Sequence, residues 1–141
     1  MIQRIQSVWL LLAGIAGVLA IRLPLWKATL QDKTVKIFSG PESLLLFAVM
    51  IIATLLAFVT IFLYKNRKLQ MRLCIFGILL SIATILLEFF KVGNFRQPLN
   101  IFESSWQIGA LLPILMIVFF MFAYSNIRKD EKLVKSLDRL R

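Results

Sequence analysis

The 141-residue sequence has no histidine and a single cysteine, Cys74. Without histidine the chain lacks an imidazole base, metal ligand or pH switch. One cysteine excludes a disulfide scaffold and a Cys/His zinc module. Gly-rich phosphate loops, Walker patterns and nucleophile elbows are also absent. We therefore expect no enzymatic activity, no cofactor and no metal. We interpret Cys74 as a small buried hydrophobe, with palmitoylation as the alternative.

Acidic residues are scarce, with 7 Asp and Glu against 17 Lys and Arg, and the formal net charge is +10. Hydrophobic residues make up 60% of the chain and its mean hydropathy is +0.84. Soluble domains contain about 45–50% apolar residues. The composition therefore excludes a disordered chain and indicates an integral membrane protein embedded in a lipid bilayer.

Apolar runs near the roughly 20 residues that cross a hydrocarbon layer occur four times. We predict spans at about residues 7–23, 43–64, 72–90 and 105–124. With no repeat and no long linker, residues 1–141 form a single domain, an all-α four-transmembrane-helix bundle. Pro113 should kink the last span or mark its late start. Small residues favour helix contacts in lipid, and we expect such a face inside the bundle: Ala13, Ala16, Gly17 and Ala20.

The basic residues divide unequally between the two sides of such a bundle. Eleven lie at the N-terminus, in the loop between spans two and three and in the C-terminal tail, whereas six lie in the other two loops. The positive-inside rule then places both termini in the cytoplasm. A signal peptide cleaved near residues 18–20 is the alternative for the first span, but an uncleaved helix is the simpler interpretation.

The two loops expected outside are short. Residues 28–38 alternate weakly around Asp32 and Lys33, which suggests a small β-hairpin or an irregular loop. Residues 94–103 mix apolar and polar side chains and are expected to lie in the headgroup layer.

Few polar side chains fall within the spans. We expect each hydroxyl to bond the carbonyl one turn back, at Thr54, Thr60, Ser81 and Thr84. Glu88 has Lys91 at i+3, which predicts an interfacial ion pair. In the alternative, the carboxylate of Glu88 faces an outward pocket and binds a cation. Arg22 either snorkels outward or pairs with Glu88 or Glu103.

Residues 127–141 have helical periodicity, and we predict an amphipathic cytoplasmic helix after span four. Its apolar arc includes Leu133 and Leu137, and an opposite basic stripe comprises Arg128, Lys132, Lys135 and Arg139. Three interpretations remain open: a helix lying on anionic lipid, a solvated tail, or a docking surface for an acidic protein or RNA. The stripe points away from the apolar arc, which favours docking, with Arg67 and Lys68 contributing from the loop.

Several segments carry a resemblance across essentially the whole chain. They are the start at residues 1–6, the exit of the first span at 23–26, the loop at 66–74 and the terminus at 128–141. Together they resemble an uncharacterised family of small four-span inner-membrane proteins of Bacteroidota, known as a domain of unknown function. The resemblance implies a bacterial cytoplasmic membrane and four helices, but no activity or site residues.

Our first hypothesis is a non-enzymatic accessory or scaffold subunit whose basic cytoplasmic face binds a larger assembly, such as a protein or a ribonucleoprotein. The alternative is a small carrier or channel for an ion or a lipid-like molecule, which would use Glu88 and Arg22. The oligomeric state stays open.

Overall fold

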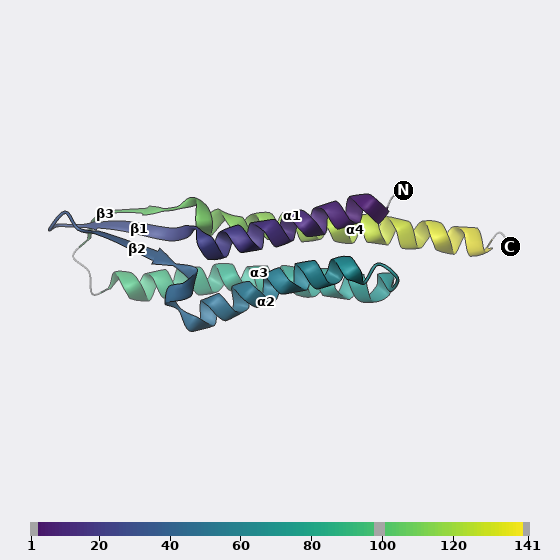
Figure 1. Ribbon diagram of the computed structural model, residues 1–141, viewed down its shortest axis with the longest axis horizontal. Helices are drawn as coiled ribbons and strands as arrows, with labels where there is room; N and C mark the ends of the chain where they lie inside the picture. The colour runs from purple at the N-terminus through teal and green to yellow at the C-terminus, as the bar shows by residue number, and fades with distance from the viewer. Residues whose placement is uncertain (1–2, 98–100, 140–141) are drawn as a thin grey trace.

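The computed structural model describes residues 3–97 and 101–139 of the chain, and the side chains of residues 5–97 and 101–137. Four long helices run side by side and a small sheet extends from one end of them (Figure 1). The elements in chain order are α1 (Gln3–Arg22), β1 (Pro24–Leu30), β2 (Val35–Ser39), the 3-10 turn η1 (Gly40–Glu42), α2 (Leu44–Phe62), α3 (Arg67–Arg96), β3 (Ile101–Trp106), the 3-10 turn η2 (Ile108–Leu111) and α4 (Leu112–Arg139).

The helices form a closed ring in which α1 packs on α2 and α4, and α3 packs on the same two helices. The two ends of this bundle differ. We call the end that carries β1, β2 and β3 the sheet end, and the opposite end, with the α2–α3 connection and both termini, the tail end (Figure 1). All four helices are long and apolar enough to cross a membrane, so the prediction of four such helices is confirmed. Their bounds differ most in α4, which begins later than predicted and continues into the predicted tail; α3 is longer than predicted at both ends.

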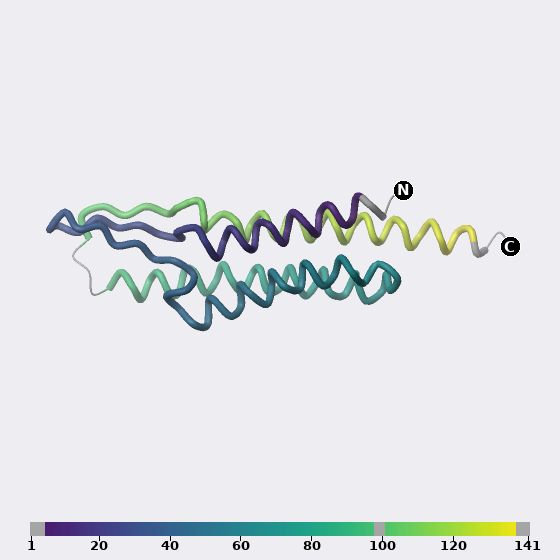
Figure 2. The backbone as a smooth tube through the Cα atoms, viewed as in Figure 1, coloured from purple at the N-terminus to yellow at the C-terminus, as the bar shows by residue number. Residues whose placement is uncertain are grey.

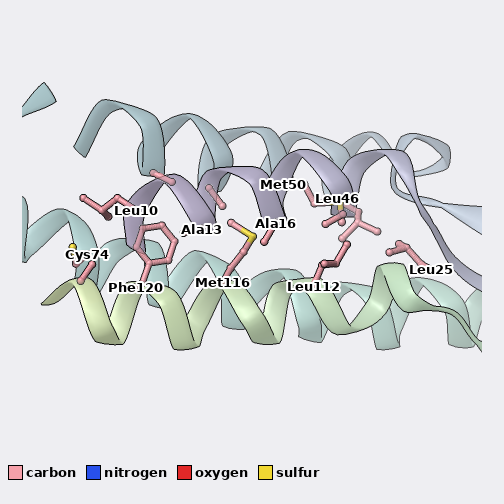
Figure 3. Close-up of a cluster of buried hydrophobic side chains, with 14 of the residues drawn as sticks. Leu10, Ala13, Ala16, Leu25, Leu46, Met50, Cys74, Leu112, Met116 and Phe120 are labelled. Atoms are coloured by element: carbon pink, nitrogen blue, oxygen red, sulfur yellow. The ribbon is translucent and has the colours of Figure 1, made fainter. Parts of the chain in front are cut away.

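The small face of α1 lies inside the bundle, as predicted. Ala13, Ala16 and Ala20 are buried, and a Cβ added to Gly17 would meet the side chain of Thr54 on α2. Larger side chains from the other helices pack in the core beside this small face, among them Met50, Met116 and Phe120 (Figure 3). Cys74 is fully buried in the same core, which agrees with its interpretation as a small hydrophobe.

The fold is mostly helical, as predicted, but it is not all-α, because a three-stranded antiparallel sheet with the order β2-β1-β3 caps one end. Of the two alternatives for residues 28–38, the hairpin is the one present, and it begins earlier than expected, at Pro24. Its turn contains Lys33 with a φ of 61°, a left-handed conformation that allows the chain to reverse. The sheet packs on the end of α3, where Phe95 lies edge-on to Trp26 with ring centroids 5.9 Å apart.

The third strand comes from the segment that we expected in the headgroup layer. Helix α3 continues to Arg96, and β3 then pairs with β1 in the register Lys27–Ser105 and Thr29–Glu103. Strand β1 has two edges, and backbone groups on both need partners. The hairpin satisfies one edge of β1 and β3 satisfies the other.

The prediction of a separate helix in the tail is also wrong, because α4 runs without interruption from Leu112 to Arg139. The tail is the continuation of the fourth helix past the α2–α3 connection (Figure 2). Pro113 is the second residue of α4, so it marks a late start, one of the two outcomes expected for it. Residues 140 and 141 of the predicted tail lie outside the described residues.

The four hydroxyls within the helices bond as predicted. Each donates to the carbonyl four residues earlier at 2.6–2.9 Å, namely Thr54 to Met50, Thr60 to Leu56, Ser81 to Gly77 and Thr84 to Leu80. These groups are satisfied within their own helices, as an apolar interior requires.

Candidate functional site

A basic groove lies at the tail end, between the α2–α3 connection and α4. It has a volume of about 510 Å³ and is lined by residues 64–68 on one side and by Glu131, Val134 and Lys135 on the other. Its walls carry four cationic side chains against one carboxylate, and we call this site the basic groove: Lys65, Arg67, Lys68 and Lys135 against Glu131.

The first wall is held by hydrogen bonds around a tight connection. The backbone N–H of Asn66 donates to the carbonyl of Leu63 at 3.0 Å, and the N–H of Gln70 donates to the carbonyl of Asn66 at 2.9 Å. The buried side-chain amide of Gln70 donates to the carbonyl of Thr60 at 3.1 Å. This carbonyl lies in the last turn of α2, where intrahelical donors run out; it also accepts the backbone N–H of Leu63 at 3.3 Å, so Gln70 supplies a second donor.

The second wall is held by a buried bond between the two terminal helices. The side-chain amide of Gln6 on α1 donates to the carboxylate of Asp130 on α4 at 2.7 Å, and both residues are buried. This bond connects α4 to α1 one residue before Glu131, which lines the groove together with Val134 and Lys135. Lys135 Nζ lies 3.0 Å from Glu131 Oε1, and the Lys135 side chain is exposed whereas that of Glu131 is half-buried.

The structure brings together some of the predicted partner-binding residues. Arg67, Lys68 and Lys135 line the basic groove. Arg128 and Lys132 are exposed on α4 but do not line it, and the side chain of Arg139 lies outside the described part of the chain. Leu133 and Leu137 are 52% and 66% exposed, and together with Val134 they form an uncovered apolar strip beside the cations.

Sequence reasoning missed the buried amides and Asp130. The spacing of the two glutamines from buried residues could have indicated that their amides are buried. Gln6 precedes Leu10 and Ala13 at steps of four and three residues, and Gln70 precedes Cys74 and Gly77 in the same way. Each amide therefore lies on a buried helix face.

A second feature lies near the sheet end, where Glu88 is only 2% exposed. Its Oε1 atom is buried and has no hydrogen-bond partner. The predicted ion pair with Lys91 does not form, and within residues 5–97 and 101–137 no cation lies within ion-pair distance of Glu88. Arg22 likewise makes no such pair with Glu88 or Glu103 among these residues.

Glu88 borders a cavity of about 280 Å³ between α3 and the η2–α4 junction, and we call it the Glu88 pocket. Apolar side chains make up most of its wall, and Arg22 does not line it. The structure therefore separates the two residues that the carrier hypothesis combined.

These features define the class of protein: a single bundle of four potentially membrane-spanning helices, capped by a three-stranded sheet and bearing a basic groove at the opposite end. Within this class, the chain belongs to the family of the domain of unknown function DUF4293, whose model matches residues 2–140. This membership confirms the predicted uncharacterised family. No curated protein and no solved structure matches the chain.

Proposed function

We propose that this protein is a non-enzymatic subunit of the bacterial cytoplasmic membrane that binds an acidic segment of a partner protein in the basic groove. The observation that carries the proposal is the convergence of four cations from two separate segments on one concave surface. In the proposed topology both termini and the groove are cytoplasmic, because eleven of the 17 basic residues belong to the tail end.

The direction of the tail supports a protein ligand over the membrane surface. Because α4 is continuous from Leu112 to Arg139, a helix that crosses the bilayer carries its last turns away from the lipid. An interfacial helix instead lies in the plane of the membrane. Leu133 and Leu137 then face the aqueous phase and need another apolar surface.

The mixture of side chains favours an acidic protein over RNA. Val134 lines the groove between Glu131 and Lys135, and Leu133 and Leu137 are exposed on the same helix. Phosphate recognition relies on cations and polar groups, whereas a protein segment can use both the cations and the apolar strip. An amphipathic acidic helix has the complementary chemistry.

Neutralising the groove tests the proposal. We would express the full chain with Arg67→Gln, Lys68→Gln and Lys135→Gln together, and place a photo-crosslinking residue at Leu133. The unaltered groove should crosslink one protein reproducibly, and that protein's contact region should be acidic. We expect the triple variant to lose about 90% of this crosslink, which corresponds to roughly 1.4 kcal/mol of binding free energy.

A matched variant controls for net charge. Lys27→Gln, Lys33→Gln and Lys36→Gln remove three cations from the sheet end and should leave the crosslink unchanged. A crosslink that survives neutralisation of the groove contradicts the proposal, as does one that is equally weakened by both variants. Crosslinking to RNA or to anionic lipid in place of a protein also contradicts it.

The carrier alternative finds little support within one molecule. The space in the middle of the bundle, bordered by Gly17, Thr84 and Met116, holds essentially no water-sized volume, at about 0 Å³. This space, which residues of all four helices line, is too small to hold a hydrated ion.

A further inference from the structure

The Glu88 pocket lies near the outer limit of the helices at the sheet end. Gln70 on α3 bonds to Thr60 on α2; Glu88 is eighteen residues after Gln70, and Glu42 is eighteen residues before Thr60. Because antiparallel helices rise equally per residue, Glu88 is level with the turn where α2 begins. In a membrane, this level is the boundary between hydrocarbon and headgroups.

The carboxyl group of Glu88 lacks a hydrogen-bond partner, in the described part of the chain, for one of its two oxygen atoms. Its Oε1 atom is buried without a partner, and the nearby amide of Gln107 donates instead to the hydroxyl of Ser105 at 2.9 Å. An ionised carboxylate in such a setting is strongly destabilising unless a cation and hydrogen-bond donors accompany it. The group therefore needs either its own proton or a cationic partner.

The walls of the pocket determine what kind of cation fits. Phe89 and Trp106 lie beside the opening with ring centroids 5.0 Å apart. Ile108, Leu111 and Ile114 line the pocket and are 70%, 59% and 46% exposed. Glu88 is the one carboxylate among the residues that line the pocket, and among the described residues no group of three His, Cys, Asp or Glu side chains could hold a metal ion. A hard metal cation usually takes several oxygen ligands, so a single carboxylate in apolar walls suits it poorly. Aromatic and aliphatic walls suit an alkyl chain, and aromatic faces attract an ammonium group.

We propose that the Glu88 pocket binds an amphiphilic amine that enters from the bilayer, with its ammonium on the Glu88 carboxylate and its alkyl chain along Leu111 and Ile114. The neutral amine partitions into the membrane and takes the proton of the Glu88 carboxyl group. One O–H bond breaks and one N–H bond forms, so the ammonium–carboxylate pair is neutral as a whole. The amine is either the headgroup of an aminophospholipid or a free lipophilic amine.

Protection of Glu88 from a hydrophobic carbodiimide tests the site. This reagent adds to a protonated carboxyl group in an apolar setting, and the ion pair prevents that addition. We would reconstitute the full chain in phosphatidylglycerol nanodiscs, which contain no amine, and follow modification of Glu88 by peptide mass spectrometry. Decylammonium at about ten times its Kd should slow the modification about tenfold, whereas decanol, which has the same chain without the charge, should not.

A second set of discs distinguishes the two sources of the amine. If phosphatidylethanolamine slows modification as decylammonium does, the ligand is the lipid headgroup. If only decylammonium protects, the ligand is a free amine. Equal modification in all discs overturns the proposal, and so does equal protection by decanol.

Thermal unfolding gives an independent readout that does not need the carbodiimide. Decylammonium should raise the Tm of the wild type and of Glu103→Gln, which alters an exposed carboxylate on β3. It should not raise the Tm of Glu88→Gln, which keeps the shape of the side chain and removes its charge. The same rise in all three proteins overturns the proposal even if carbodiimide modifies none of them. These outcomes do not depend on the basic groove at the other end.

Discussion

One side-chain hydrogen bond connects residues 124 positions apart, from Gln6 on α1 to Asp130 on α4. It is a polar contact on faces that are otherwise apolar, and both partners are almost fully buried. Such a contact contributes less through its own strength than through what its loss exposes, because the remaining partner becomes a buried group without a hydrogen bond.

Asp130→Ala should therefore destabilise the fold by about 1–3 kcal/mol, since the Gln6 amide is left unsatisfied. Asp130→Asn retains an acceptor oxygen and should be milder. Asp32→Ala removes an exposed carboxylate from the hairpin turn and serves as the control. Equilibrium unfolding in detergent measures the three differences, and equal stability of Asp130→Ala and Asp32→Ala would contradict the role of the bond.

Two glycines in helices should respond in opposite directions to the same substitution. A Cβ on Gly17 would meet Thr54, and the Met116 side chain at 3.2 Å, whereas a Cβ on Gly93 would meet nothing within 4 Å. Gly17→Ala should destabilise by about 1–3 kcal/mol through overpacking. Gly93→Ala should stabilise by up to about 1 kcal/mol through helix propensity. Unfolding midpoints give both signs, and stabilisation by Gly17→Ala would show that α1 and α2 are not closely packed.

At the scale of elements, the continuity of α4 decides how the tail can act. A tail that folds back along a surface and a tail that continues the bundle present different faces, although their sequences have the same periodicity. In the structure the buried part of the apolar arc, at Ile127, packs within the bundle. The later part, at Leu133 and Leu137, passes beyond it and is exposed. The buried part of α4 therefore holds the helix in the bundle, and its later part forms one wall of the basic groove.

The continuity of α4 predicts a distance. Spin labels at Leu115 and Leu137 should be separated by about 33 Å between Cα atoms, because 22 residues of helix rise by 1.5 Å each. Leu45 and Phe62 on α2 provide a control pair at about 26 Å. Pulsed electron paramagnetic resonance in a Cys74→Ser background measures both. A clearly shorter distance in α4, with α2 as expected, would mean that the tail bends away from the bundle axis.

At the scale of the whole molecule, the surplus of basic residues and the sheet lie at opposite ends of the bundle. Both proposed sites depend on this polarity, because the basic groove belongs to the tail end and the Glu88 pocket to the other. The connection between residues 62 and 67 is short, so it cannot move far from the ends of α2 and α3.

The positive-inside distribution predicts the orientation in cells. In a Cys74→Ser background, Leu137→Cys should be protected from an impermeant maleimide in intact cells, and Lys36→Cys should react. Lysis should expose Leu137→Cys equally. Labelling of Leu137→Cys before lysis, with Lys36→Cys protected, would place the basic groove outside the cytoplasm and remove the basis of the proposed function.

The helices could be predicted because apolar length and charge placement are local properties. The buried hydroxyls, the small face of α1 and the late start at Pro113 all follow from residues within one helix. The sequence identified Glu88 as a candidate residue, but it did not predict that the side chain is buried without an ion-pair partner among the described residues. Its position seven residues after Ser81 and four after Thr84 places it on the buried face of α3, whereas the pairing rule suggested Lys91 at i+3.

The amino-acid sequence by itself determined that this chain has four apolar helices and a surplus of cations at one end, and it left a hairpin and an irregular loop as alternatives between the first two helices. Only the tertiary structure decided that residues 101–106 complete a sheet, that α4 continues into the tail, and that Arg67, Lys68 and Lys135 face one groove. The physical reason is the distance along the chain over which each interaction acts. Hydrophobic runs and helix periods act over a few residues, whereas a strand partner, a buried Gln6–Asp130 bond and a shared groove depend on which distant segments pack together.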